Sequence, residues 1–139
     1  METDAAQRLG IPADLMQREA RELMTPGVLS IVEDASLRQV MRALTGHRVH
    51  ALLVVGTAGA PLGWVTAHGL LAWVDKDPAM AVARDAITEP ARSVEPSASG
   101  REVVAALQQG VSHLLVQRNA RELPEGVISD LDLLAVGQG

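Results

Sequence analysis

The sequence contains an internal repeat with an offset of 63 residues, and this repeat constrains the fold more than any other feature. Four segments of the first half match four segments of the second half in the same order. They are residues 20–25 (ARELMT) and 83–88 (ARDAIT), 49–54 (VHALLV) and 111–116 (VSHLLV), 63–66 (GWVT) and 126–129 (GVIS), and 70–72 and 133–135 (both LLA). The second pair has an offset of 62, so the alignment needs small compensating gaps. One such match arises by chance, but four in one order indicate a tandem duplication.

Chain length indicates that the two copies pack against each other. The chain has 139 residues, and a lone unit of about 60 residues buries too little of its surface to be comfortably stable. Hydrophobic residues make up 47% of the sequence, and Phe and Tyr are absent. We therefore expect an aliphatic core, in which Trp64 and Trp73 supply the only aromatic rings.

Each copy has the pattern strand, helix, strand, strand, helix, which indicates an α+β (α/β-type) fold. The first helix has apolar residues at helical spacing, namely Leu37, Val40, Met41 and Leu44. Asp34 is its candidate start, and Ser99 with Glu102 forms a candidate capping box in the second copy. The other expected elements are strands 28–32, 51–55, 62–65, 91–95, 113–116 and 125–128 and helices 67–74 and 130–136. Because 51–55 and 113–116 are continuously apolar, both are expected to be buried on both faces.

Charge and composition exclude several classes of protein. A formal net charge of −5 argues against general nucleic-acid binding, because neutralising phosphates needs a cationic face. No apolar run is long enough for a membrane span, and the N-terminus lacks the pattern of a signal peptide, so cytoplasmic residence is expected. The absence of Cys excludes disulfides and thiolate metal sites. Arg outnumbers Lys by 11 to 1, which we interpret as a sign of a GC-rich bacterial genome.

The second copy resembles the signature of the cystathionine β-synthase (CBS) domain. The resemblance is carried by residues 110–116 (GVSHLLV) and 126–134 (GVISDLDLL). The first copy adds the opening residues 23–26 (LMTP) and the closing residues 63–66 (GWVT), so the resemblance covers about residues 20–139. It implies an N-terminal helical extension (1–19), a first CBS domain (20–76), a connector (77–82) and a second CBS domain (83–139). We also expect the extension to be helical around residues 13–23 and to act as a lid or dimer element.

This resemblance implies a Bateman module, in which two CBS domains pack through their sheets about a pseudo-twofold axis. Such modules are regulatory rather than enzymatic. They commonly form homodimers, bind AMP, ADP, ATP or S-adenosylmethionine in clefts between the domains, and pass a ligand-induced movement to a partner. No cofactor is required. The effector protein is unknown, and neither nucleic acid nor membrane is expected as a partner.

The most specific binding motif is residues 126–132 (GVISDLD), which is similar to the family's ribose–phosphate motif G-h-h-S/T-x-x-D. Gly126 has no Cβ and would let a ligand approach the strand backbone, with Val127 beside it. Ser129 lies where strand becomes helix, and free N–H groups there attract phosphate. Asp132 can accept hydrogen bonds from both ribose hydroxyls. The competing interpretation is a simple helix cap, since Ser-x-x-Asp is also a capping pattern.

The first copy departs from this motif. Gly63 and Thr66 are in place, but Gly69 stands where the ribose-binding acid is expected, so this site is predicted to be degraded. Trp64 lies beside it, and we favour a core role over stacking on a base. One competent site per chain follows, centred on the second motif.

Polar residues at other family positions complete the candidate set. Ser112 and His113 would contact phosphate in the intact site, and His50 is the counterpart of Ser112 in the degraded one. Their alternative is a pair of polar residues at a strand entrance. Thr88 and Thr25 precede the first strands and are assigned to the intact and the degraded site, respectively, although both also suit simple turns.

Other chemistry has little support in the sequence. His47 and His50 lack a nearby third ligand, so we expect no metal site. Ser112, His113 and Asp132 supply the letters of a triad, but no nucleophile elbow surrounds the serine, so the chain is not expected to be an enzyme. The main alternative to ligand sensing is a ligand-free structural or dimerisation module that acts through protein–protein contacts, which the missing acid at Gly69 favours.

Overall fold

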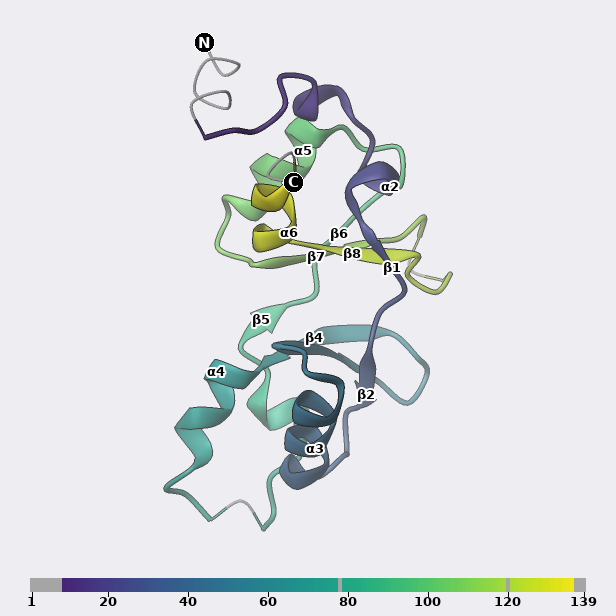
Figure 1. Ribbon diagram of the computed structural model, residues 1–139. Coiled ribbons are helices and arrows are strands. Elements are labelled where there is room, and N and C mark those ends of the chain that lie inside the picture. The colour runs from purple at the N-terminus through teal and green to yellow at the C-terminus, as the bar shows by residue number, and fades with distance from the viewer. Residues whose placement is uncertain (1–8, 78, 120, 137–139) are drawn as a thin grey trace. The chain divides into compact units, whose positions relative to one another are not determined.

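The structure is a computed structural model that describes residues 9–77, 79–119 and 121–136. It contains two compact units, each built on a four-stranded sheet (Figure 1). The continuous unit is Val28–Ala91, and the discontinuous unit combines the described parts of Met1–Gly27 and Arg92–Gly139. Both mix strands and helices, which confirms the α+β class predicted from the sequence.

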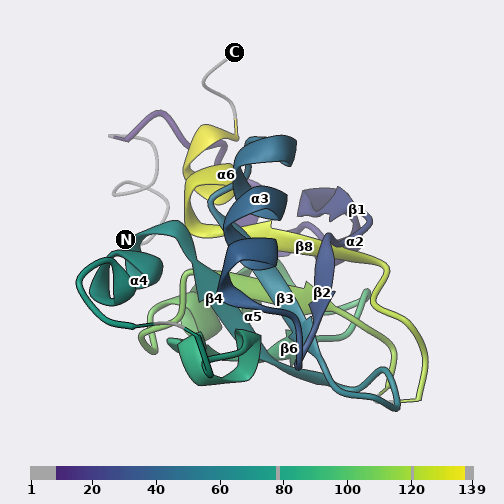
Figure 2. The same cartoon turned by 90° about the horizontal axis from the view of Figure 1, so that it is seen from below.

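The continuous unit has a sheet with strand order β2-β3-β4-β5. Its strands are β2 (Ser30–Val32), β3 (Ala51–Val55), β4 (Pro61–Thr66) and β5 (Glu89–Pro90), and only the β2–β3 pair is parallel. Its helices are α3 (Leu37–His47), α4 (Ala67–Leu70) and the 3-10 turns η2 (Leu71–Trp73) and η3 (Ala83–Ala86). Figure 2 shows α3 lying across this sheet. The aliphatic core between them includes Val40, Leu44, Leu52, Val54 and Val65, as expected from the composition.

The discontinuous unit repeats this layout with strand order β1-β8-β7-β6. Its strands are β1 (Thr25–Pro26), β6 (Ser93–Val94), β7 (His113–Val116) and β8 (Gly126–Ser129), and only the β6–β7 pair is parallel. Its helices are η1 (Leu15–Gln17), α2 (Ala20–Leu23), α5 (Gly100–Leu107) and α6 (Asp130–Ala135). The core includes Leu23, Val103, Leu114, Ile128 and Leu133. Three successive residues of β7, Leu114 to Val116, are buried, as the continuous apolar run predicts.

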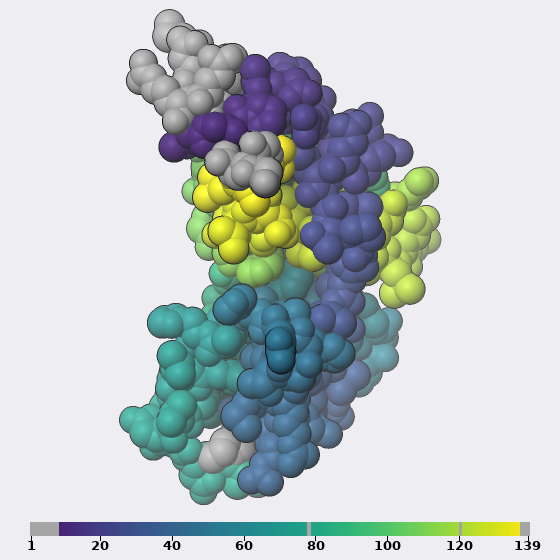
Figure 3. All heavy atoms as spheres, viewed as in Figure 1, coloured from purple at the N-terminus to yellow at the C-terminus, as the bar shows by residue number. Residues whose placement is uncertain are grey.

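The first segment of each repeat packs with the body of the other repeat. Residues 20–27 belong to the discontinuous unit, where β1 pairs with β8 (Thr25 with Val127). In return, residues 83–91 belong to the continuous unit, where β5 pairs with β4 (Glu89 with Trp64). Figure 3 shows the N-terminal segment lying against the C-terminal part of the chain. The sequence repeats and the packing units are therefore different divisions of the chain.

A glycine in each second hairpin strand makes this exchange possible. A Cβ on Gly126 would lie 2.5 Å from the carbonyl oxygen of Thr25 and 2.6 Å from the Sδ of Met24. A Cβ on Gly63 would lie 2.5 Å from the Cγ2 of Ile87 and 2.7 Å from the carbonyl oxygen of Glu89. Real Cβ atoms do not make such contacts, so only glycine lets the edge strand approach at these positions.

The predicted helix starts and lengths are correct only in part. Helix α3 begins after Ser36 and not at Asp34, because the Ser36 Oγ accepts a hydrogen bond from the Gln39 N–H at 3.1 Å and the Gln39 side chain accepts from the Ser36 N–H at 2.8 Å. In α5 the expected Ser99 cap is present, and its Oγ accepts from the Glu102 N–H at 3.2 Å. The helix predicted for 67–74 changes to a 3-10 turn after Leu70.

The helical prediction for residues 13–23 is also only partly correct. Two short pieces, η1 and α2, replace one helix because Arg18 and Glu19 are extended. Glu19 pairs with Ser99 in an isolated bridge, and the Arg18 carbonyl accepts from the Gly100 N–H at 2.7 Å. These contacts fix the segment against α5 within its own unit. The lid or dimer role expected for 1–19 stays a prediction, and residues 1–8, 78, 120 and 137–139 of the expected divisions lie outside the described residues.

We predict that Gly126→Ala loosens β1 and destabilises the protein by about 1–3 kcal/mol, as overpacking does elsewhere. The added methyl would meet backbone and sulfur atoms that cannot both retreat. Urea unfolding followed by circular dichroism measures the change. Gly46→Ala in α3 is the control, because a Cβ there meets nothing within 4 Å, and it should be neutral or stabilising. Equal stability of the Gly126→Ala variant and the wild type would contradict the packing.

We predict that Ser36→Ala lowers the free energy of unfolding by about 1 kcal/mol through loss of the helix cap. Asp34→Ala is the matched control, since Asp34 is exposed and lies outside the cap. Thermal unfolding of both variants against the wild type provides the comparison. A larger loss for Asp34→Ala than for Ser36→Ala would show that the helix begins where the sequence pattern first suggested.

Candidate ligand-binding site

The turn from β8 into α6 presents the second predicted motif. Ser129 is the N-cap of α6, and its Oγ accepts a hydrogen bond from the Asp132 N–H at 3.0 Å. The Asp130 N–H donates to the carbonyl of Ser112 at 2.9 Å, which ties the turn to the entrance of β7. The Asp132 side chain is exposed, and its carboxylate has no hydrogen-bond or ion-pair partner among the residues described. The capping interpretation is therefore correct for Ser129, whereas the Asp132 carboxylate is available to a ligand.

Ser112 and His113 lie at the other side of this turn. His113 is the antiparallel partner of Ser129, and the Ser112 Oγ lies 2.9 Å from the Nδ1 of His113. Both side chains are half-buried. The first copy repeats the backbone arrangement, because the His50 carbonyl accepts from the Ala67 N–H at 2.8 Å. His50 is thus the structural counterpart of Ser112, although its own side chain is exposed.

Each of the two threonines packs in the unit that contains the motif of the other repeat. Thr25 is exposed and pairs with Val127, so it lies in the same unit as Gly126 and Asp132 and not in that of the first motif. Thr88 lies in the unit of the first motif, where its N–H donates to the Trp64 carbonyl at 3.0 Å. The reason is the exchange of the leading segments. The alignment of the two repeats carries no signal for this exchange.

The first motif keeps its helix cap, but Thr88 and Thr66 occupy the space beside Gly69. The Thr66 Oγ1 accepts from the Gly69 N–H at 2.9 Å, so the helix cap survives without the acid. A Cβ on Gly69 would lie 2.8 Å from the Cγ2 of Thr88 and 3.0 Å from the Oγ1 of Thr66. Trp64 is buried, with 2% of its surface exposed. An acidic side chain at position 69 would therefore need Thr88 to move.

The role expected for Gly126 needs a correction. The space beside its Cα is filled by Met24 and the Thr25 backbone, so this glycine serves the approach of β1 and not that of a ligand. Gly63 has the same role beside Ile87 and Glu89. In the motif G-h-h-S-x-x-D, the glycine lets β1 approach and the serine caps α6, whereas the carboxylate of the aspartate has no partner in the part of the chain that the structure describes.

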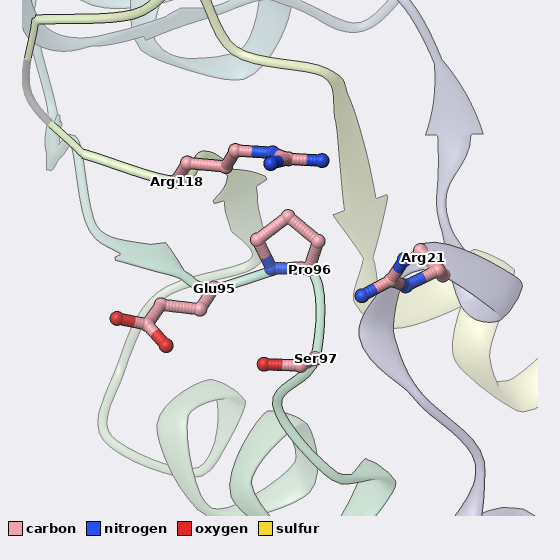
Figure 4. A pocket seen from close by; sticks show the side chains of 5 residues that line it. All are labelled: Arg21, Glu95, Pro96, Ser97 and Arg118. Atoms are coloured by element: carbon pink, nitrogen blue, oxygen red, sulfur yellow. The ribbon is translucent and has the colours of Figure 1, made fainter.

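A pocket of about 260 Å³ in the discontinuous unit lies away from this motif. Arg21, Glu95, Pro96, Ser97 and Arg118 line it (Figure 4). The pocket lies at the C-terminal ends of β6 and β7. Because β8 is antiparallel to β7, Ser129 at the end of β8 pairs with His113 at the start of β7, at the opposite end of these strands. Arg21 pairs with Glu19 at 2.7 Å and Arg118 with Glu125 at 3.3 Å, so both guanidinium groups already have a carboxylate partner. None of the predicted site residues lines this pocket.

No group of three His, Cys, Asp or Glu side chains in residues 9–77, 79–119 and 121–136 is arranged to hold a metal ion. None of the helices in these ranges has the length and apolar character needed to cross a bilayer.

Solved structures share this fold at low sequence identity. The CBS domain of a bacterial CNNM/CorC family Mg²⁺ transporter has a TM-score of 0.78 at 19% identity, over 96% of this chain and 90% of that one. The same domain in complex with ATP has a TM-score of 0.76 at 19% identity, with coverage of 96% and 93%. The CBS domain of a membrane protein from Sphaerobacter thermophilus has a TM-score of 0.74 at 19% identity, covering 98% of both chains.

A family-level comparison is more specific. No curated protein matches the chain significantly. The sequence model of the CBS domain, in contrast, matches it twice, at residues 20–76 and 83–139. These two matches cover most of the 139 residues, in agreement with the duplicated fold. The chain therefore belongs to the CBS-domain family and carries a tandem pair of CBS domains.

Proposed function

We propose that this chain is a non-catalytic regulatory module that binds an adenosyl ligand beside Asp132 and signals through a conformational or oligomeric change. The ligand is AMP, ADP, ATP or S-adenosylmethionine, and the module acts as a homodimer in the bacterial cytoplasm on an effector protein. The single observation that carries the proposal is the exposed carboxylate of Asp132, which has no partner among the described residues.

The chemistry around Asp132 suits a ribose with attached phosphate. A carboxylate accepts hydrogen bonds only, so two adjacent ribose hydroxyls can donate to its two oxygens. Ser112 and His113 supply a hydroxyl and an imidazole on the other side of the β8–α6 turn. Thr25 adds an exposed hydroxyl in the same unit, on the strand next to β8. These four residues replace the set that included Thr88, and the ATP complex of a transporter CBS domain supports the ligand class.

One ligand per chain is expected. The first motif has Gly69 in place of the acid, and the methyl group of Thr88 occupies the space that a side chain at position 69 would need. Without an acceptor for the ribose hydroxyls, the continuous unit loses the interaction on which the proposed binding mode depends.

The alternative is a ligand-free dimerisation module. Two observations favour it: Gly126 is explained by packing, and the Ser129 Oγ already caps α6. Nucleotide that stays bound through purification separates the two proposals, because it adds absorbance near 260 nm to the spectrum of the protein. Nucleotide-free protein that also fails to bind any of the four ligands would favour the alternative.

We predict that calorimetric titration with AMP, ADP, ATP and S-adenosylmethionine detects one site per chain for at least one of them. Asp132→Ala should weaken binding about 10- to 100-fold, since a hydrogen bond to a charged group contributes about 1.5–3 kcal/mol. Asp130→Asn is the control, because Asp130 is the neighbouring exposed carboxylate and bonds to the Leu131 N–H at 2.7 Å. Unchanged affinity in Asp132→Ala would refute the site, and absence of binding by all four ligands would refute the sensing function.

A further inference from the structure

The pocket beside Pro96 has a structural counterpart in the continuous unit. In the discontinuous unit the Arg21 N–H donates to the Pro96 carbonyl at 3.0 Å, and in the continuous unit the Arg84 N–H donates to the Glu33 carbonyl at 3.1 Å. Arg21 and Arg84 differ by 63 in the sequence, and so do Glu33 and Pro96, which is the offset of the repeat. Arg21 therefore corresponds to Arg84, and Pro96 corresponds to Glu33.

In the continuous unit a carboxylate of the chain itself fills this position. The Arg84 Nη1 donates to the Glu33 Oε1 at 3.3 Å, and the Thr57 N–H donates to the Glu33 Oε2 at 3.2 Å. Only 23% of the Glu33 side chain is exposed. A Cβ on Gly56 would lie 3.1 Å from the same Oε2, so the carboxylate fits closely between the arginine and the β3–β4 loop.

In the discontinuous unit this carboxylate is replaced by Pro96, and the position contains the pocket of about 260 Å³. Arg118 corresponds to Gly56, at the offset of 62 that relates β3 to β7. Figure 4 shows the guanidinium groups of Arg21 and Arg118 on either side of Pro96, with the Glu95 side chain pointing away from them. The second copy has therefore lost an anion at this position and gained a second cation.

Both arginines keep donors for a ligand, although each already has an ion-pair partner. The Nε of Arg21 lies 2.7 Å from a carboxylate oxygen of Glu19, and the Nε of Arg118 lies 3.3 Å from one of Glu125. A guanidinium group has five N–H donors, so the terminal nitrogens can still donate to another oxygen. The hydroxyl of Ser97, which also lines the pocket, is a further donor.

Charge and size favour a small organic acid as the ligand. Glu95 lines the pocket, and Glu19 and Glu125 lie beside its two arginines, so three carboxylates surround two guanidinium groups. A carboxylate with one charge is repelled less by this surrounding than a phosphate dianion. The volume of about 260 Å³ suits a small ligand, since pockets for drug-sized ligands measure about 300–1,000 Å³. Propionate reproduces the side chain of Glu33.

We propose that the pocket between Arg21 and Arg118 binds the carboxylate of a small organic acid, in the position that the Glu33 carboxylate takes in the continuous unit. This second ligand is independent of the proposed adenosyl site, because Ser129 lies at the opposite end of the strands. Arg21 belongs to α2 in the exchanged leading segment, and Arg118 begins the β7–β8 loop. The bound acid thus joins the leading segment of one repeat to the body of the other.

Nuclear magnetic resonance titration of the full-length chain with sodium propionate, at constant ionic strength, tests the site. We expect saturable shifts of the Nε–H signals of Arg21 and Arg118 and of the amide signal of Ser97. Pro96→Glu supplies the carboxylate that the continuous unit already has, so it should abolish these shifts. Pro96→Gln is the matched control, because it makes the same backbone change without the charge, and it should keep them.

A second pair of variants tests the arginines. Arg118→Gln should weaken propionate binding about tenfold, since it removes the charged donors on one side of the pocket. Arg84→Gln is the control in the continuous unit, where Glu33 already occupies the corresponding position, and it should leave propionate binding unchanged. Circular dichroism shows whether each variant is folded.

The outcomes distinguish this inference from the adenosyl proposal. Absence of saturable shifts in the wild type, or equal binding by Pro96→Glu and Pro96→Gln, would overturn the propionate site. Tighter binding of inorganic phosphate than of propionate would overturn the assignment to organic acids. Nucleotide binding beside Asp132 without any propionate binding would leave the adenosyl proposal standing and overturn this inference alone.

Discussion

The pairing of each repeat's leading segment with the body of the other repeat is the constraint on which the rest of the structure depends. Strands β1 and β5 complete the two sheets from outside their own repeats. Each edge strand approaches over a glycine, Gly126 or Gly63, where a Cβ would collide with the incoming segment. Because neither repeat supplies its own fourth strand, a single repeat lacks part of the sheet and core that it shows in the intact chain. The duplication is thus a requirement of the fold and not only a record of its origin.

The exchange also decides the composition of the candidate site. It brings Thr25 beside Val127 and leaves the carboxylate of Asp132 without a partner in the described part of the unit. In the other unit it brings Thr88 against Gly69, where a Cβ would lie 2.8 Å from the Cγ2 of Thr88. A symmetrical duplication therefore yields an asymmetrical pair, in which Asp132 follows the second motif and Gly69 stands in its place after the first.

Much of this architecture follows from the sequence, and the failures have definite causes. The strand 51–55 and the strand 113–116 are correct to the residue, because continuous apolar runs mark buried strands clearly. The cap at Ser36 was missed in favour of Asp34, since both residue types begin helices and only the hydrogen bonds decide. The alignment of the two repeats does not reveal that Thr25 packs in the unit of Gly126 and Thr88 in the unit of Gly63, because the exchange is a tertiary choice. The ligand contacts expected of both threonines stay predictions. Gly126 was linked to a ligand because a glycine in a strand has the same pattern whether a ligand or a neighbouring strand approaches it.

Cross-linking tests the exchange most directly. Because the natural chain contains no cysteine, only the two introduced cysteines can form a disulfide within the chain. Thr25 and Val127 are antiparallel Cα partners, and such partners lie about 4.5–5.5 Å apart, within reach of a disulfide. The full-length variant Thr25→Cys/Val127→Cys should form an intramolecular disulfide on mild oxidation and remain folded. Repeats that kept their own leading segments would instead place Thr88 beside Val127, so a cross-link in Thr88→Cys/Val127→Cys, with none in the first variant, would contradict the account.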